Sequence, residues 1–255
     1  MKLPVNHFKH AIKDRKLQLG LWTQLGSNIS VEIVAGTGFD WLVLDTEHAP
    51  NDYIEVYSQL QACDASGGNS QPLVRIPWND KVIIKRYLDI GAQSLLIPYI
   101  ETQEDAQAAV DATRYAPKGI RGYCGAPRAS KFGRIKDYPH VCEQELCVIV
   151  QVETKLGLDN IEKIAGVEGI DGLFIGPGDL SADLGYIHDA KHPEVIKTIE
   201  SALKRINAAG KPAGILCPDE ALSRKYIDMG FTFVAVGSDQ GLLKGGADAL
   251  LAKYR

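Results

Sequence analysis

The sequence has no long apolar run, no surplus of positive charge and no cluster of cysteines. No apolar stretch among the 255 residues approaches the ~18 residues that a membrane helix needs, and residues 1–20 lack the apolar centre of a signal peptide. Lysine and arginine number 28 against 32 aspartates and glutamates, for a formal net charge of −4. These features predict a cytoplasmic protein with neither a membrane nor a nucleic acid as its partner.

The motifs of several site classes are also missing. The five cysteines are widely spaced and form no C-x-x-C pair, which argues against a disulfide framework and predicts reduced thiols. There is no P-loop and no G-x-S-x-G elbow. Gly36-Thr-Gly38 lacks the third glycine of a dinucleotide fingerprint because position 41 is Trp. We therefore expect no nucleotide cofactor.

Eight short apolar segments recur along the chain, separated by longer segments with helical spacing. Most are apolar at every position, as Trp-Leu-Val-Leu at 41–44 and Cys-Val-Ile-Val at 147–150 show, which is typical of a parallel sheet covered on both faces. Eight β/α units in about 250 residues predict an α/β fold, a single (β/α)₈ barrel over residues 1–255, rather than an open doubly wound sheet. The predicted strands are 18–22, 41–45, 72–75, 94–97, 147–152, 172–176, 213–216 and 233–236.

Two of the intervening helices have clear ends. Apolar residues at three-and-four spacing predict a helix over 80–90 that stops at Gly91. A second helix is predicted over 192–203, with Pro193 at an early position and its end before 207–210.

The stretch 114–144 departs from the alternation of strands and helices, because it is rich in turn residues and locally basic. We expect it to follow the fourth strand and to shape the mouth of the barrel, where its cations would favour an anionic ligand. The alternative is a tolerated surface insertion. The cations are Lys118, Arg121, Arg128, Lys131 and Arg134.

Polar residues gather where the predicted strands end, which is where barrel enzymes carry their catalytic groups. The second strand runs into Asp45-Thr-Glu-His48, the third ends at Arg75, and the sixth opens into Gly176-Pro-Gly-Asp179. These groups should meet at one mouth. Trp22, Asp45 and Leu216, at the ends of the first, second and seventh strands, should line it as well.

The fifth strand places Gln151 and Glu153 on one side, because side chains two positions apart share a face of a strand. A carboxylate on an otherwise apolar strand is costly unless it has a cation, a metal or a proton. We interpret Glu153 as a metal ligand, and the alternative is a buried glutamate paired with lysine or arginine.

Asp179 supplies a second carboxylate at a strand-to-helix turn. It can cap the helix, and the same turn leaves the backbone N–H groups of Gly178 and Asp179 free for a substrate carboxylate. Together with Glu153 it forms a set of hard oxygen ligands that suits Mg²⁺ or Mn²⁺ better than zinc.

Of the six histidines, only His48 lies next to a strand end. A lone histidine is usually a surface or packing residue, but this position favours an acid/base role.

Four motifs resemble those of the metal-dependent 2-keto-3-deoxy-acid aldolases, a family that includes the 2-keto-3-deoxyglucarate, 2-keto-3-deoxyrhamnonate and 4-hydroxy-2-oxoheptanedioate aldolases. They are FDWLVLDTEHAPN at 39–51, VQVE at 150–153, GIDGLFIGPGDLSA at 169–182 and FVAVGSD at 233–239. The resemblance covers nearly the whole chain. It implies a (β/α)₈ barrel that assembles as a homohexamer, with the last helix packed on a neighbouring subunit, and cleavage of a 4-hydroxy-2-oxo acid to pyruvate and an aldehyde.

The resemblance also implies roles for individual residues. Glu153 and Asp179 would bind the divalent metal, Mg²⁺ first and Mn²⁺ or Co²⁺ as alternatives, while Gln151 would contact the substrate. The N–H groups of Gly178 and Asp179 would hold the pyruvyl carboxylate. The remaining roles are acid/base for His48, enolate stabilisation for Arg75, and tuning of the histidine by Asp89 from a neighbouring subunit. These roles suit retro-aldol chemistry, which removes the C4 hydroxyl proton while negative charge develops at the C2 oxygen.

The substrate is predicted from finer similarities. Residues 82–91 and 210–216 are closest to the 2-keto-3-deoxyglucarate branch, which makes pyruvate and tartronate semialdehyde the first expected products. Tyr123, Cys124 and Pro127 depart from the family pattern and bear on the aldehyde end. The alternatives are cleavage of 4-hydroxy-2-oxoheptanedioate to pyruvate and succinate semialdehyde, metal-dependent oxaloacetate decarboxylation, a Schiff-base aldolase using Lys155, and a non-catalytic sugar-acid binding protein.

Overall fold

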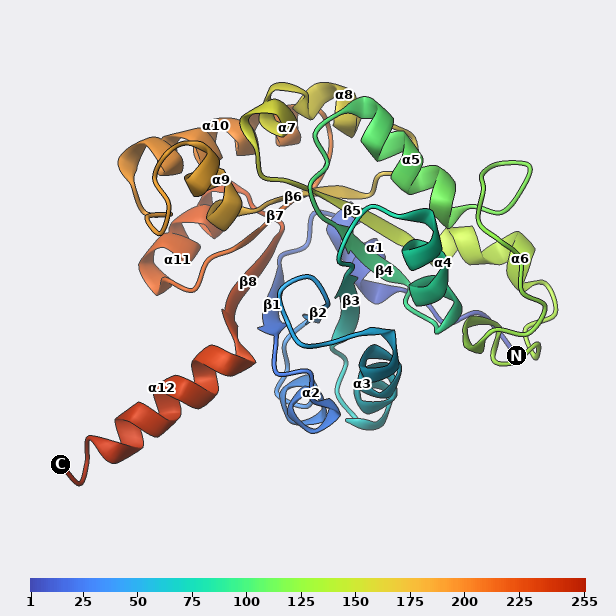
Figure 1. Cartoon of the computed structure of the whole chain (residues 1–255), viewed down its shortest axis with the longest axis horizontal. Helices are drawn as coiled ribbons and strands as arrows, with labels where there is room; N and C mark the ends of the chain where they lie inside the picture. Colours follow the sequence, from blue (N-terminus) through green and yellow to red (C-terminus); the bar gives the residue numbers. More distant parts are fainter.

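The structure, a computed structural model that describes residues 1–255, is a closed barrel of eight parallel strands in sequence order (Figure 1). Every predicted strand is present, with bounds that differ by at most two residues. The predicted (β/α)₈ barrel is therefore confirmed. The strands are β1 Gln18–Thr23, β2 Trp41–Asp45, β3 Gln71–Arg75, β4 Ser94–Ile97, β5 Cys147–Val152, β6 Gly172–Ile175, β7 Ala213–Leu216 and β8 Phe233–Ser238.

α-Helices connect and flank the strands along the chain. They are α1 His7–Lys13, α2 Asn28–Ala35, α3 Tyr53–Ala65, α4 Lys81–Asp89, α5 Gln103–Thr113, α6 Tyr138–Val141, α7 Lys155–Asp159, α8 Ile161–Ala165, α9 Pro177–Asp183, α10 Pro193–Ala208, α11 Glu220–Met229 and α12 Asp239–Leu251. The predicted helix 80–90 is α4, capped by the Asp80 side chain. The helix predicted over 192–203 is α10, which begins as expected but continues to Ala208 because Ile206 extends its buried face. No helix is both long and apolar enough to cross a membrane.

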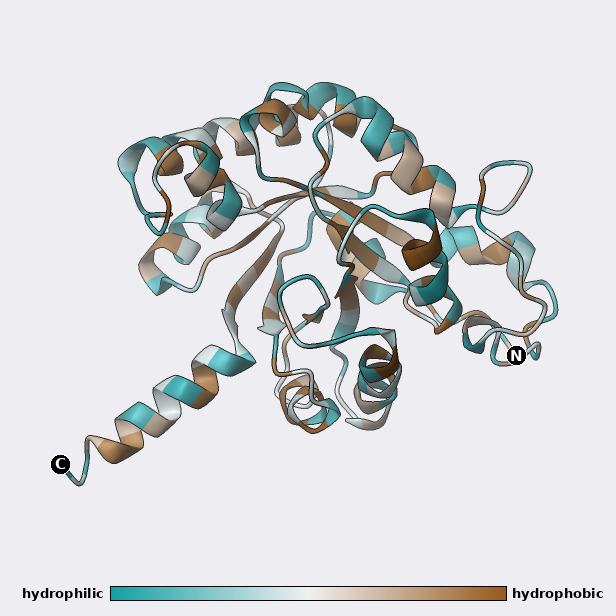
Figure 2. Ribbon diagram, viewed as in Figure 1, coloured by the Kyte–Doolittle hydropathy of each residue, from teal (hydrophilic) through white to brown (hydrophobic).

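The strands are buried on both faces, which explains their uniform apolar composition (Figure 2). One apolar cluster lies between the strands and the helices, and a second fills the barrel interior. Helix α1 closes the N-terminal end of the barrel, where the Phe8 ring lies 5.5 Å from Trp41 and 5.6 Å from Phe233. Glycine is required at Gly214 because a Cβ there would collide with the Phe233 ring. The interior is thus packed solid below the mouth.

The basic stretch lies at the opposite end of the barrel from the one we expected. Helix α5 intervenes after β4 and returns the chain to the N-terminal end of the barrel before the stretch begins. The expectation that these residues shape the mouth of their own barrel is therefore wrong. Most of their charge is also paired internally, since Lys118 contacts Glu143, Arg121 contacts Asp89 and Arg128 contacts Asp64.

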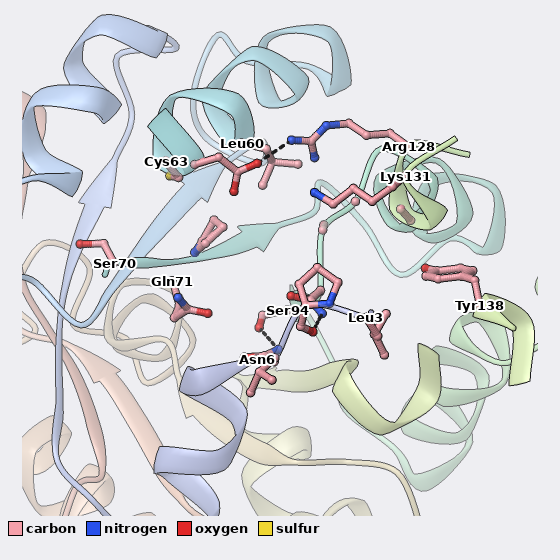
Figure 3. Close-up of a pocket in the computed structure, with 18 of the residues that line it drawn as sticks. Leu3, Asn6, Leu60, Cys63, Ser70, Gln71, Ser94, Arg128, Lys131 and Tyr138 are labelled. Carbon is pink, nitrogen blue, oxygen red and sulfur yellow. Dashed lines mark hydrogen bonds and ion pairs between the residues drawn. The ribbon is translucent and has the colours of Figure 1, made fainter. Parts of the chain in front are cut away.

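Part of this stretch lines a pocket of about 290 Å³ at the N-terminal end of the barrel (Figure 3). Arg128 and Lys131 face Asn6 and Ser94 across it. Arg128 donates to the Asp64 carboxylate and to the backbone carbonyl of Ile90. This pocket is separate from the mouth, where the predicted site residues gather.

Helix α12 projects away from the barrel instead of covering it (Figure 1). Only its first residue, Asp239, is buried. Four leucines of this helix are exposed by half or more of their surface: Leu242, Leu243, Leu250 and Leu251. An apolar helix face of this kind is what a protein–protein contact buries.

Candidate active site

Strand periodicity directs the fifth-strand polar residues into the mouth, as the sequence predicted. Ile149 belongs to the interior cluster, whereas Val148, Val150 and Val152 belong to the cluster beneath the helices. Gln151 and Glu153 share the parity of Ile149 and are themselves buried. Their side chains therefore point into the barrel interior near its C-terminal end.

Arg75 and Asp45 form a two-point contact at the mouth. The guanidinium Nε donates to Asp45 Oδ1 at 2.9 Å, and Nη2 donates to Oδ2 at 2.7 Å. The guanidinium also lies over the Trp22 ring, 4.8 Å from its centroid, and the Trp22 indole N–H donates to Asp45 at 3.1 Å. Burial alone would raise the pKa of Asp45, but the hydrogen bond and charge of Arg75 outweigh it and hold that pKa below its ordinary value.

Glu47 is a third carboxylate at this end of the barrel. Its Oε2 lies 2.8 Å from Nη1 of Arg75, and its side chain is 11% exposed. Burial raises the pKa of Glu47 to about 7; Arg75 opposes that change, while Asp45 and Asp179 add to it. Glu47 lies inside the motif at 39–51, but the sequence alone predicted no role for it. The sequence feature that could have identified Glu47 is the presence of two carboxylates, Asp45 and Glu47, beside a single arginine, Arg75, at the end of the next strand.

Glu153 is buried without a cationic partner. It is 1% exposed, its Oε1 accepts from the backbone N–H of Tyr99 at 2.9 Å, and its Oε2 accepts from the Gln151 amide. No lysine or arginine forms an ion pair with it, so the alternative of a glutamate paired with such a residue is wrong. Burial raises its pKa to about 7, with the Gln151 and Tyr99 hydrogen bonds opposing and the charges of Glu47 and Asp179 adding.

Asp179 lies in the first turn of α9, three residues after the cap. The capping residue is Gly176 and the helix has no side-chain cap, so the alternative of Asp179 as the cap is wrong. The N–H groups of Gly178 and Asp179 have no partner within the helix, because the first turn lacks acceptors. Gly176 is sterically required, since an added Cβ would collide with the Glu153 carboxylate and lie 2.9 Å from its Cβ.

The donor set at the mouth fits a hard divalent cation. Glu153 is a desolvated carboxylate without a counter-charge, and Gln151 Oε1 is buried without a hydrogen-bond partner. A cation beside them would remove both costs. No group of three or more His, Cys, Asp or Glu side chains is arranged around one point. A metal held by Glu153 and Asp179 would therefore keep positions for water and substrate, which suits Mg²⁺.

The other predicted residues occupy three different places. His48 is exposed in the turn after β2, and its N–H lies 3.4 Å from Asp45 Oδ1. Leu216, at the end of β7, packs against the interior cluster. Lys155 is exposed at the start of α7, beyond the end of its strand.

Asp89 does not reach the mouth of its own barrel. It is the last residue of α4, and the helices of a β/α unit end at the N-terminal end of the barrel. There its Oδ1 accepts from Arg121 at 2.7 Å. Within one chain, then, the structure brings together Trp22, Asp45, Glu47, Arg75, Gln151, Glu153 and Asp179, and it leaves Asp89 at the other end.

Known proteins are similar to this chain over nearly its whole length. The family model described as HpcH/HpaI aldolase/citrate lyase matches residues 18–244. A Rhizobium etli protein named pyruvate aldolase is 49% identical over 254 residues, covering 100% of this chain and 99% of its own length. A Salmonella paratyphi A protein named 4-hydroxy-2-oxo-heptane-1,7-dioate aldolase is 51% identical over 250 residues, covering 98% of this chain and 94% of its own.

A solved structure of an HpcH/HpaI aldolase/citrate lyase family protein from Burkholderia cenocepacia superposes with a TM-score of 0.94 at 40% identity. The match covers 98% of this chain and 100% of that one.

Proposed function

Because this chain belongs to the HpcH/HpaI aldolase/citrate lyase family and is a pyruvate aldolase, we propose that it cleaves 4-hydroxy-2-oxoheptanedioate to pyruvate and succinate semialdehyde. Enzymes of this family generally depend on a divalent metal ion. For this chain we propose Mg²⁺, held by Glu153 and Asp179. The observation that carries the proposal is the buried Glu153 carboxylate, which has hydrogen bonds but no counter-charge.

The choice of substrate differs from the first sequence-based expectation. That expectation was 2-keto-3-deoxyglucarate, with 4-hydroxy-2-oxoheptanedioate as the alternative. A relative that is 51% identical over 250 residues carries the name of the alternative. We therefore place the seven-carbon dioate first and the sugar acid second.

The residues at the mouth divide the chemistry among them. When bound, the metal supplies Lewis-acid stabilisation for the charge that develops at the C2 oxygen. Arg75 adds a fixed positive charge at the same end of the barrel. The N–H groups of Gly178 and Asp179 hold the substrate carboxylate, and Gln151 orients it. His48, exposed beside Asp45, takes the proton of the C4 hydroxyl, directly or through a water molecule.

Asp89 can act at the mouth only in an assembly with a second copy of the chain. It lies at the end of the barrel opposite His48, so an effect on the histidine requires another subunit. We propose a homohexamer in which α12 packs on a neighbour and Asp89 approaches the neighbour's His48. The support is the exposed leucine face of α12 together with Ile29 and Ile33 of α2, each 66% exposed.

A coupled assay of pyruvate release tests the proposed function. The enzyme is given 4-hydroxy-2-oxoheptanedioate, 2-keto-3-deoxyglucarate or oxaloacetate, each with Mg²⁺ and lactate dehydrogenase. We expect the highest kcat/KM with the heptanedioate and a second product that reacts as an aldehyde. Turnover of oxaloacetate alone, with release of carbon dioxide, would instead identify a decarboxylase. Binding without turnover of any of the three would identify a sugar-acid binding protein.

A further inference from the structure

Every nitrogen of the Arg75 guanidinium has a carboxylate partner. Asp45 accepts from Nε at 2.9 Å and from Nη2 at 2.7 Å. Glu47 lies 2.8 Å from the third nitrogen, Nη1. An anionic ligand that takes the position beside Nη1 must therefore displace Glu47.

The two carboxylates are held very differently. Asp45 is unexposed and accepts from four further donors. They are the side chains of Trp22 at 3.1 Å and Gln24 at 3.3 Å, and the backbone N–H groups of Glu47 at 3.0 Å and His48 at 3.4 Å. Removing Asp45 from Arg75 would leave all of these donors and a buried charge unsatisfied, which is strongly unfavourable.

Glu47 is the weaker partner. Its Oε2 is within ion-pair distance of Arg75, but the two groups are not aligned as a hydrogen bond, and no other donor reaches that atom. The oxygen is nonetheless buried. Burial also raises the pKa of Glu47 to about 7 against the opposing charge of Arg75, so the ion pair does not offset the cost of burying the charged form. Glu47 therefore loses little when it leaves Nη1.

The charges at the mouth also favour displacement of Glu47 from Arg75. Asp45 and Glu47 together carry more negative charge than Arg75 offsets, and Asp179 acts on Glu47 from the opposite wall. Two carboxylates beside a guanidinium weaken the positive potential that an incoming anion meets. With Glu47 displaced, Nη1 becomes available while Asp45 keeps the guanidinium plane fixed.

We propose that Glu47 contacts Nη1 of Arg75 only in the absence of ligand. The oxo or carboxylate oxygen of a 2-oxo acid displaces Glu47 and binds Nη1 in its place, so that competition from Glu47 lowers the affinity for the ligand. Asp45 is then the permanent partner of Arg75 and Glu47 the temporary one. The inference rests on the proposed function, since the ligand is a 2-oxo acid. It makes Glu47 a positioning residue that holds the empty site in order and competes with the substrate.

The test is calorimetric binding of pyruvate to the full chain saturated with Mg²⁺. Replacing Glu47 should tighten binding, because the ligand no longer has to break an ion pair. We expect the Kd for pyruvate to fall about three- to ten-fold in Glu47→Ala, the range that corresponds to the loss of one weak ion pair. Glu47→Gln should fall between Glu47→Ala and the wild type, because its amide group still occupies the space beside Nη1 but carries no charge. A purely structural role would weaken binding instead.

Two controls separate competition from other effects. Glu101→Gln removes a carboxylate at the same end of the barrel that accepts from Thr154 and does not touch Arg75, so it should leave the Kd for pyruvate unchanged. The Mg²⁺ affinity of each variant, measured without pyruvate, shows whether the metal site is intact.

A Kd that is unchanged or higher in both Glu47 variants, with Mg²⁺ affinity preserved, would overturn the inference and leave the proposed function standing. An equal tightening in Glu101→Gln would also overturn it, because long-range charge would then explain the result. Absence of pyruvate binding to the wild type would contradict the proposed function itself.

Discussion

Arg75 and Asp45 meet edge to edge across adjacent strands, with Nε 2.9 Å from Oδ1 and Nη2 2.7 Å from Oδ2. The register of the barrel places the two residues directly opposite one another at the ends of β2 and β3. This fork fixes the plane of the guanidinium at the mouth, which a single charge on a flexible stem cannot do.

Arg75→Lys tests the importance of that plane. The lysine keeps the positive charge but cannot form both contacts with Asp45. Loss of one preorganised donor to a developing oxyanion costs about 10²- to 10³-fold in rate, and we expect kcat/KM for the aldol cleavage to fall by that factor. Pyruvate-release kinetics provide the measurement, and a kcat/KM within about three-fold of the wild type would show that charge alone is sufficient.

Gly176→Ala should damage the metal site through Glu153. The added methyl group would collide with the Glu153 carboxylate, and the backbone of a barrel strand end has little freedom to move. We expect the Mg²⁺ affinity, measured by calorimetry, to fall at least ten-fold. The matched variant is Gly178→Ala, two residues on in the same turn, where an added methyl meets nothing within 4 Å. Equal Mg²⁺ affinities in the two variants would contradict this account of Gly176.

The pH dependence of stability should differ with and without metal. Glu47 and Glu153 both have pKa values raised from 4.5 to about 7. Between these values the folded state binds more protons than the unfolded state, so the free energy of unfolding falls as pH rises through this window, and the stabilisation is lost above about 7. Asp45 has a lowered pKa, so it is ionised in both the folded and the unfolded protein over this pH range. It therefore adds no change to the free energy of unfolding there.

Mg²⁺ should reverse this trend, because it binds the ionised form of Glu153 and releases a proton. We expect the increase in Tm on adding Mg²⁺ to be small at about pH 5.5 and larger at about pH 8. The Glu153→Gln variant should show no such pH-dependent increase. A larger increase at the lower pH would contradict the assignment of Glu153 as a ligand.

The exposed leucine face of α12 predicts assembly. Leu243→Glu should lower the molecular mass in light scattering from that of the proposed hexamer, because it would place a charge in the proposed contact of α12. Lys244→Glu, at the next position and 79% exposed in its side chain, should keep the wild-type mass. Since exposed substitutions change folding stability by only about 0.5 kcal/mol, the monomer fold should survive in both. An unchanged mass in Leu243→Glu would show that α12 is not part of the interface.

The features that the sequence predicted correctly depend on local periodicity. Eight apolar runs define the strands, and the two-residue repeat of β5 places Gln151 and Glu153 in the mouth without knowledge of their partners. Glu47 escaped assignment because its contact with Arg75 depends on the turn after β2, which the strand period does not describe. The basic stretch was misplaced because the intervening helix α5, which is rich in alanine, reverses the direction of the chain before that stretch begins.

The most direct test of the central claim is pyruvate release from 4-hydroxy-2-oxoheptanedioate by enzyme treated in two ways. One sample is stripped with EDTA and reloaded with Mg²⁺, and the other is treated with borohydride in the presence of pyruvate. The account predicts loss of activity on stripping, recovery on reloading and no effect of borohydride. Activity that survives EDTA but is abolished by borohydride, with a pyruvate adduct on Lys155, would contradict it.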